Sequence, residues 1–427
     1  MKVKLSYGKR GLVIELPEDK AHFEVIRPKH VPAVSNPKTA LREAILNPIG
    51  TQPLPQLVNR DDTVAIVFSD ITRPTPNHLI LPEILSILDF VSDEQIILCN
   101  ALGTHRPNTI EELSTMLGDE LVNRYRIVQN NCFDPETQVY LGKSSKGHDQ
   151  WINREFMNAS VKILTGFIEP HFFAGFSGGG KAVMPGMAGQ MTVLGNHDAG
   201  MIGDPNATYG VTHGNPIWEE AREIALMTNP TFLLNVTLNS DKQITGVFAG
   251  DLESAHDAGI EFVRDTAMIE VDDLFDIVIT TNSGYPLDMN LYQCGKGMSA
   301  AEQIIKPDGK IIIAAECSEG IPEHGLYATL LSEASTPQEL FDNIMNLPHA
   351  RQDQWAAQIQ ARIQLKSDVF LYSDGLTDEQ ITNALLTPCR DIEHLITDLI
   401  KEFGAETRIG ILPEGPQTIP YHRKLKG

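Results

Sequence analysis

The sequence lacks the features that would assign it to a membrane or a secreted class. No apolar run approaches the ~20 residues that a membrane-spanning helix needs. Its five cysteines are scattered over 427 residues without a C-x-x-C pair, which argues against a disulfide framework or a cysteine-type zinc site. The first residues include lysines but no apolar core and no small-residue cleavage site, so no signal peptide is expected. A reducing, cytoplasmic compartment is the simplest expectation.

Positive charge is also scarce. The chain has 34 Lys and Arg against 56 Asp and Glu, a formal net charge of −22. Such a surface repels phosphate backbones and anionic lipid, so neither nucleic acid nor a membrane is expected as a partner. An anionic substrate would need a local basic pocket. The 42% of hydrophobic and 21% of charged residues are an ordinary globular balance, which excludes a disordered or fibrous protein.

Short apolar runs rich in Ile and Val alternate with amphipathic stretches along a chain too long for one compact core. This alternation predicts an α/β protein of two domains, with mostly parallel sheets flanked by helices. We expect the active site in the cleft between the domains. We place the domains at 1–270 and 271–427, and the last strand, near 407, could return to the first domain. The expected strands are Thr63–Phe68, Gln95–Cys99, Val161–Thr165, Phe232–Val236, Asp276–Thr281, Lys310–Ala314, Asp368–Tyr372 and Thr407–Leu412.

Local signals mark a turn and several helix starts. The N-terminal residues alternate between apolar and polar side chains on either side of Gly8, which predicts a hairpin. Thr109 with Glu112, and Thr377 with Gln380, match the capping box that opens many helices. We therefore expect helices to begin at these two threonines.

Polar loops punctuated by Gly and Pro follow four of the expected strands. Ligands of open parallel sheets bind beyond the carboxyl ends of the strands, so these loops predict a site. His105 and His171 are the histidines of interest, because each lies just past a strand end within the same inferred crevice. The four loops are 69–74, 102–107, 166–171 and 282–286.

The densest polar segment runs from 171 to 186 and is rich in glycine. Glycines let the backbone approach a ligand closely, and their free N–H groups can form an anion nest. The spacing of Gly175, Gly180 and Lys181 matches most of a Walker A loop, but Ala182 stands where a hydroxyl should hold Mg²⁺. The segment therefore favours a phosphate-cradling loop with a lysine placed for covalent or electrostatic work over a nucleotide triphosphatase.

Other candidates are weaker when taken singly. Ser177 lies in a G-x-S-x-G string, but a nucleophile elbow needs a strand directly before it and a helix directly after, so a serine hydrolase is only the third choice. His197 can be a metal ligand or a helix residue, and the chain has no H-E-x-x-H or zinc-like cluster. His148 and His213 lie in polar loops and carry no prediction.

Two cations stand out against the acidic background. Arg73 follows the first of the four strands, and Lys296 lies in the polar cluster 284–297. These cations are what a carboxylate substrate would need inside an acidic protein. The alternative for the 284–297 cluster is a helix N-terminus with incidental Lys and Tyr side chains.

Five motifs occur together in one order: SDITRPTP, GTHRP, GFIEPHFFAGFSGGGK, GNH and GYPLDMNLYQxxKGMSAAE. Together they resemble the nickel-pincer lactate racemases and their α-hydroxy-acid racemase relatives, and the similarity runs from near Asn47 to near Trp355. The resemblance implies a nickel-pincer nucleotide, a pyridinium-3-thioamide-5-thiocarboxylic acid mononucleotide. Its thioamide would attach to a lysine, and its nickel would be held by the pincer and one histidine.

Matched motif by motif, the resemblance assigns roles to individual residues. The lysine that carries the cofactor falls on Lys181 and the nickel ligand on His197, while the two acid/base histidines fall on His105 and His171. The substrate-binding positions fall on Arg73, Gln293, Lys296 and Trp355, and further cofactor contacts on Asp70, Ser177, Gly178 and Tyr292.

The implied activity is the interconversion of D- and L-2-hydroxy acids, with lactate as first choice, by reversible hydride transfer to the cofactor and two histidine acid/bases. A racemase or epimerase of another α-hydroxy acid or sugar acid, and a silent relative that binds a carboxylate or nucleotide, stay open. The implied partners are the substrate and the cofactor-synthesis proteins, and a homodimer is also open. Three departures bear on specificity: Gly180 where Arg is common, Thr104 where Phe is usual, and Cys294 where small apolar residues are typical.

Overall fold

The computed structural model describes residues 1–322 and 325–422, which fall into two compact units. The central unit comprises 30–197 and 204–265, and the terminal unit comprises 1–29, 198–203 and 266–427. This division differs from the predicted 1–270 and 271–427 mainly in the first 29 residues. They join the terminal unit because β3 (His22–Val25) pairs in parallel with β19 (Arg408–Ile411). The strand near 407 therefore also belongs to the terminal unit.

The central unit is built on a six-stranded sheet in the order β13-β12-β9-β4-β5-β6. All neighbouring pairs are parallel except β12 and β13, which are antiparallel. The four strands predicted in this region are confirmed, whereas β6 and β13 were not predicted. The bounds are β4 (Val64–Ser69), β5 (Ile96–Ala101), β6 (Arg126–Gln129), β9 (Val161–Phe167), β12 (Phe232–Leu238) and β13 (Ile244–Gly250).

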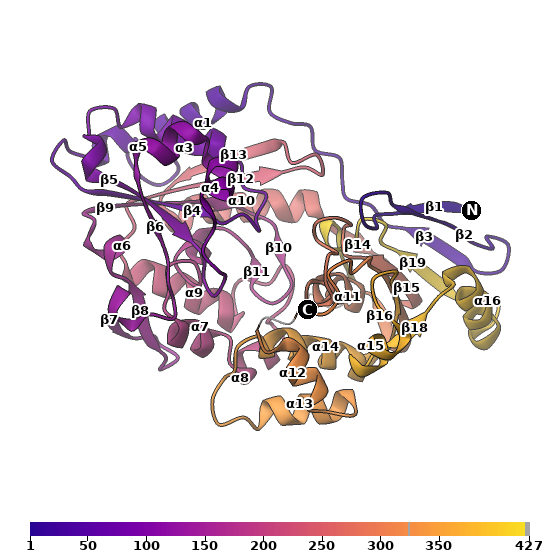
Figure 1. Ribbon diagram of the computed structural model, residues 1–427. Coiled ribbons are helices and arrows are strands. Elements are labelled where there is room, and N and C mark those ends of the chain that lie inside the picture. Colours follow the sequence, from indigo (N-terminus) through magenta and orange to yellow (C-terminus); the bar gives the residue numbers. More distant parts are fainter. Residues whose placement is uncertain (323–324, 423–427) are drawn as a thin grey trace. The chain divides into compact units, whose positions relative to one another are not determined.

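Helices cover both faces of this sheet, as the apolar character of its strands predicts (Figure 1). Successive side chains of β4 point to opposite faces, so Ile66 belongs to one core cluster and Val67 to the other. The first face packs against α1 (Pro37–Leu46), α3 (Asn77–Ile87), α4 (Ile110–Leu117) and α5 (Asp119–Arg124). The second face packs against α6 (Arg154–Asn158), α7 (Gln190–Asn196), α9 (Pro216–Met227), α10 (Leu252–Ala267) and the hairpin of β7 (Gln138–Lys143) and β8 (Asp149–Asn153).

The order in which successive strands are added to the sheet reverses at β4. The chain moves from β4 through β5 to β6 on one side, and it later returns to place β9 on the other side of β4. Such a switch point opens a crevice at the carboxyl ends of the strands. The loops that follow β4, β5 and β9 therefore leave the sheet at one edge, as the sequence predicts.

The terminal unit contains a second six-stranded sheet, in the order β18-β17-β16-β15-β19-β3, in which all neighbouring pairs are parallel. Its four predicted strands are confirmed, and so is the N-terminal hairpin of β1 and β2, which packs with α16 in one core cluster. The bounds are β1 (Lys2–Leu5), β2 (Leu12–Glu15), β15 (Phe275–Thr281), β16 (Ile305–Ala314), β17 (Asp368–Tyr372), β18 (Thr387–Cys389), α11 (Gly295–Glu302), α14 (Gln354–Lys366) and α16 (Ile392–Phe403).

Both predicted capping boxes are present, at Thr109 with Glu112 and at Thr377 with Gln380. Among residues 1–322 and 325–422, no helix has both the length and the apolar character needed to cross a membrane. The remaining elements are short: α2 (Leu54–Leu57), α8 (Ala199–Gly203), α12 (Tyr327–Ser332), α13 (Pro337–Met345), α15 (Asp378–Asn383), β10 (Pro170–His171), β11 (Gly175–Phe176), β14 (Met268–Val271), β20 (Ile419–His422) and the 3-10 turns η1 (Asp93–Gln95), η2 (Pro135–Thr137), η3 (Gly179–Ala182), η4 (Leu291–Cys294) and η5 (Gly415–Gln417).

Candidate active site

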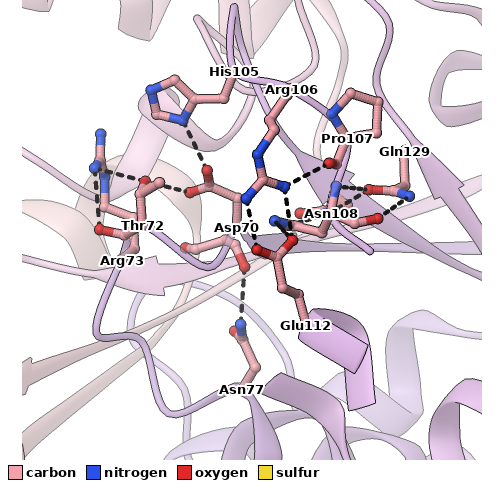
Figure 2. A network of polar contacts seen from close by, with 12 residues as sticks. Asp70, Thr72, Arg73, Asn77, His105, Arg106, Pro107, Asn108, Glu112 and Gln129 are labelled. Atoms are coloured by element: carbon pink, nitrogen blue, oxygen red, sulfur yellow. Dashed lines mark hydrogen bonds and ion pairs between the residues drawn. The ribbon is translucent and has the colours of Figure 1, made fainter. Parts of the chain in front are cut away.

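His105 and Asp70 form a pair at the carboxyl edge of the central sheet (Figure 2). Asp70 follows β4 and His105 follows the neighbouring strand β5. Nδ1 of His105 lies 2.8 Å from Oδ2 of Asp70, and the exposed fractions of the two side chains are 44% and 4%. A buried carboxylate thus holds one ring nitrogen, and the other nitrogen of this half-exposed imidazole remains for a ligand.

The carboxyl group of Asp70 is held in its ionised form. Burial alone would raise its pKa, but the hydrogen bond and electrostatic interaction with His105, together with the charge of Arg73, outweigh burial. The hydroxyl of Thr72 also donates to Oδ1 of Asp70, at 2.8 Å. The pKa of Asp70 is therefore lowered from its ordinary value, which makes this carboxylate a permanent hydrogen-bond acceptor for His105 at neutral pH.

Arg73 lies on the same loop. Its Nη1 donates to the hydroxyl of Thr72 at 3.0 Å, and Figure 2 shows the guanidinium folded back toward that side chain. Its charge is close enough to Asp70 to lower the pKa of that carboxyl group. One of the two predicted local cations is thus held beside the buried carboxylate.

The loop that carries His105 is braced by polar side chains (Figure 2). Arg106 makes two hydrogen bonds to Glu112, at 2.8 and 2.7 Å, and this pairing lowers the pKa of Glu112 to about 2. The backbone N–H of Asn108 donates to Oε1 of Gln129 at 2.7 Å. The capping box of α4 and strand β6 therefore both hold the residues that follow His105, which limits how far its backbone can move.

A second group of candidates gathers around the ring of Phe173, which is 4% exposed. The ring centroid of His171 lies 4.5 Å from that of Phe173, and the centroid of His197 lies 5.1 Å from it, both in edge-on geometry. Nζ of Lys181 lies 5.6 Å from the same ring centroid. Three residues that sequence reasoning chose separately thus share one aromatic neighbour.

His197 is a buried imidazole at the end of α7, 4% exposed. Burial and the nearby charge of Lys181 lower its pKa to about 3, so the ring is neutral at physiological pH. A neutral imidazole is the form that ligates a metal. Within residues 1–322 and 325–422, no three His, Cys, Asp or Glu side chains are grouped to hold a metal ion.

The glycine-rich loop is packed tightly rather than left open. Gly179 has a φ of +53°, and a Cβ there would lie 2.2 Å from Nδ1 of His256. A Cβ on Gly180 would lie 2.7 Å from the carbonyl oxygen of Ala221. The N–H of Gly179 donates to Oδ1 of Asn235 at 2.8 Å. The N–H of Gly179 is therefore not free for the predicted anion nest. Glycine is required at 179 and 180 because neighbouring atoms leave no room for a Cβ.

Ser177 closes this loop. Its hydroxyl donates to the carbonyl of Phe167 at 3.0 Å and accepts the N–H of Glu169 at 2.9 Å. A buried hydroxyl held by the main chain is not the geometry of an activated serine, which counts against the hydrolase alternative.

His256, which sequence reasoning missed, also supports the loop. Its Nε2 lies 3.0 Å from the carbonyl oxygen of Ser177, and its ring is buried. Burial lowers the pKa of His256 to about 4, even though this hydrogen bond opposes the shift. No motif surrounds His256 in the sequence, so no local signal could have found it.

The remaining candidates lie on the terminal unit. Tyr292 and Gln293 belong to η4, Lys296 lies in the first turn of the helix α11, and Trp355 is on α14. Nε1 of Trp355 donates to the hydroxyl of Tyr292 at 3.0 Å, so these two candidates are in contact. Gln293 and Lys296 are half-buried. The side chain of Asn290 accepts the N–H of Gln293 at 3.3 Å and caps this helical turn.

Family comparisons match both parts of the chain. Residues 7–210 match the lactate racemase N-terminal domain, and residues 271–419 match the lactate racemase C-terminal domain. A lactate racemase of Lactiplantibacillus plantarum is 38% identical over 378 residues, which cover 88% of this chain and 89% of that protein. A lactate racemase of Thermoanaerobacterium thermosaccharolyticum is 35% identical over 422 residues, 98% of each chain.

Solved structures show the same likeness. The lactate racemase apoprotein from Thermoanaerobacterium thermosaccharolyticum superposes with a TM-score of 0.92 at 34% identity, covering 98% of this chain and 100% of that one. A protein from Thermotoga maritima has a TM-score of 0.70 at 18% identity, covering 92% of this chain and 100% of its own. At that identity the second likeness extends to the fold alone.

Proposed function

This chain belongs to the lactate racemase family, and on that premise we propose that it interconverts the D and L enantiomers of lactate. It is an isomerase of the α/β class, with a family domain matched in each half. The observation that carries the proposal is the gathering of His171, Lys181 and His197 around the Phe173 ring. A metal ligand, a lysine and an acid/base residue are what the proposed reaction needs from this part of the chain.

We propose that the resident cofactor is the nickel-pincer nucleotide, attached to Lys181 and ligated by His197. The residues fit this group, because His197 is a buried, neutral imidazole beside the lysine. A soft sulfur and carbon donor set suits nickel with one imidazole from the protein. When bound, the cofactor supplies a hydride acceptor that takes the hydrogen of the substrate carbon and returns it. Ser177, Gly178 and Tyr292 are proposed as further cofactor contacts, whereas Asp70, which the family motif assigns to the cofactor, pairs with His105.

His105 is proposed as one of the two bases that handle the hydroxyl proton. Since Oδ2 of Asp70 can only accept, the proton of a neutral His105 ring lies on Nδ1, and Nε2 is ready to take a proton. The ionised Asp70 also stabilises the imidazolium that forms. General bases of this kind contribute ~10²–10⁴-fold to rate.

His171 is proposed as the second base, and its ring is held in the opposite tautomer. Its Nδ1 accepts the N–H of Ala174 at 3.2 Å, so the proton of a neutral ring lies on Nε2. His105 thus offers an acceptor while His171 offers a donor. In this arrangement His171 is set to donate, and it can act as the base for the other enantiomer only when its proton lies on Nδ1, which requires the contact with the N–H of Ala174 to break.

Arg73 is our candidate for the substrate carboxylate, because it is a cation tethered beside the Asp70–His105 pair. Lys296, Gln293 and Trp355 are the substrate-binding candidates of the terminal unit, proposed from the family motifs. We count the proteins that synthesise the cofactor among the partners. We also place the enzyme in the cytoplasm, where its five buried thiols would stay reduced.

The test uses protein from a host that makes the cofactor. Intact-mass analysis should find an adduct localised to Lys181, elemental analysis should find nickel, and the loaded protein should racemise both D- and L-lactate. Lys181→Ala should abolish the adduct and the activity together. A loaded protein that turns over a larger 2-hydroxy acid but not lactate would transfer the proposal to that substrate, whereas full activity without nickel or adduct would refute it.

A further inference from the structure

The nickel-ligand candidate His197 sits at the end of a helix too short to be stable alone. Helix α7 has seven residues, and the backbone N–H of His197 donates to the carbonyl of Val193 at 2.9 Å. Isolated helices of this length do not persist in water, so neighbouring elements must hold it in place. The position of the His197 ring therefore depends on whatever anchors the last turn of α7.

A buried carboxylate anchors that turn. Asn196, directly before His197, is fully buried, and its Nδ2 donates to Oε2 of Glu220 at 2.8 Å. Oε1 of Glu220 lies 2.8 Å from Nδ1 of His148 and accepts the hydroxyl of Ser144. One carboxylate from α9 thus joins α7 to the turn of the β7–β8 hairpin.

The charge on this carboxylate is stable at neutral pH. Burial would raise the pKa of Glu220, but the hydrogen bonds from His148, Ser144 and Asn196 outweigh burial, and the pKa is lowered. A buried charge with three donors is costly to disturb, because removing one partner leaves the others without compensation. These hydrogen bonds to Glu220 therefore hold α7, α9 and the hairpin turn in a fixed arrangement.

His148 also packs directly on α7. A Cβ on Gly195 would lie 2.9 Å from Cβ and from Cγ of His148, so the imidazole occupies the space beside the last turn. Farther back along α7, the hydroxyl of Thr192 accepts the N–H of Trp151 at 2.7 Å and donates to the carbonyl of Asp149 at 3.0 Å. Strand β8 and its turn thus hold α7 at two points.

We propose that Glu220 is a positioning residue that acts through Asn196 and His148 to aim the imidazole of His197 at nickel. This inference rests on the proposed function, in which His197 is the metal ligand. Glu220 has no direct part in the chemistry. Its role is to keep the last turn of α7 in one arrangement, as partners behind a metal ligand commonly do.

The test compares Glu220→Gln with a matched control, Glu223→Gln. Glu223 lies one turn farther along α9, and its carboxylate accepts the N–H and the hydroxyl of Ser145, each at 2.6 Å. It therefore holds the same hairpin turn from the same helix through comparable hydrogen bonds, but these bonds do not involve α7. Both variants are prepared in the cofactor-competent host.

The readout is nickel retained per Lys181 adduct during exposure to a chelator. Glu220→Gln should keep the adduct but lose nickel ~10–100-fold more readily, the usual cost of removing a partner behind a metal ligand. Glu223→Gln should match wild type. In cofactor-free protein, amide hydrogen exchange over 190–197 should speed up in Glu220→Gln and stay unchanged in the control.

Asn196→Ala is the second variant, because it cuts the link to α7 while Glu220 keeps Ser144 and His148. It should show the same nickel loss, so the test does not depend on how well Glu220→Gln folds. Wild-type nickel retention in both Glu220→Gln and Asn196→Ala would overturn the inference. Absence of both nickel and adduct from the wild type would instead overturn the proposed function, and this inference with it.

Discussion

Asp70 and His105 are 35 positions apart in the chain, yet Oδ2 of one lies 2.8 Å from Nδ1 of the other. The contact exists because β4 and β5 are neighbours in the central sheet and end at the same edge. It converts an ordinary loop histidine into one with a defined tautomer and a buried counter-charge. Asp70 was assigned to the cofactor from its motif alone, and the structure adds a partner that the motif does not reveal.

Asp70→Asn tests this pairing. An amide can donate to Nδ1 of His105 and so favours the tautomer with its proton on Nε2, which removes the base. We expect racemisation to fall by ~10²–10⁴-fold, the usual contribution of a general base. The Lys181 adduct and nickel content should not change, and they serve as the control. Parallel loss of adduct and activity would place Asp70 on the cofactor instead.

His105→Ala and His171→Ala should stop racemisation in both directions, because the cycle cannot close without both bases. In a single turnover, each variant should still oxidise one enantiomer to the bound keto acid, and the two variants should prefer opposite hands. The affected hand should lose ~10²–10⁴-fold. Chiral analysis of the bound product measures this. The two-base hydride scheme fails if both variants lose the same hand, or if deuterium on the substrate carbon washes out into solvent during turnover.

Arg73→Ala should weaken turnover of lactate by ~2 kcal/mol or more, which is roughly 30-fold in kcat/KM, because it removes one partner of a desolvated charge pair. Arg73→Lys should recover part of the loss, since it restores the charge without the planar fork. Intact mass should show a normal adduct in both variants. Should the adduct disappear with the activity, Arg73 binds the cofactor phosphate.

Gly179→Ala should destabilise the protein, because Gly179 combines a φ of +53° with His256 in the position of the missing Cβ. Gly147→Ala is the matched control, since Gly147 also has a positive φ, +87°, but no heavy atom within 4 Å of its added Cβ. Both variants incur about 1–2 kcal/mol for the left-handed backbone. Thermal unfolding should show a larger loss of stability in Gly179→Ala than in Gly147→Ala. Equal losses would mean that the His256 side chain moves aside without destabilising the protein.

Glu112→Gln should destabilise the protein in a pH-dependent way. The pKa of Glu112 is about 2 in the folded protein, mainly because of Arg106, against about 4.3 when unfolded. A lowered pKa contributes stability that is present above the unfolded value and is lost as pH falls through the folded value. The gap between wild type and Glu112→Gln should therefore be full at pH 7 and shrink below pH ~4.3.

Unfolding midpoints measured from pH 7 downward test this sign. Glu120→Gln is the control, because its carboxylate is 83% exposed and lies 4.0 Å from Arg124. It should show little effect at any pH, as exposed pairs contribute little. A gap at Glu112 that stays constant with pH would assign its role to packing rather than to charge.

Local sequence patterns were sufficient to predict the strands and the loops that carry the candidate residues. Runs such as Val64–Phe68 are apolar throughout because both faces of a parallel sheet are covered, and that pattern is local. The capping boxes are also local patterns, because their two residues lie three positions apart in the sequence. His105 and His171 were found because they follow such strands, and Lys181 and His197 because their motifs are contiguous.

Which of these residues are in contact, and which neighbours hold them in place, depends on how the chain folds. The first 29 residues belong to the terminal unit because β3 pairs with β19. The sequence around β3 gives no sign of a partner so far away in the chain. Asp70 contacts His105 because their strands are neighbours in the sheet, and Glu220 contacts Asn196 because their two helices pack together. A buried Glu or His has the same local signature as an exposed one on an amphipathic helix. Its role depends on donors that the folded chain brings from elsewhere.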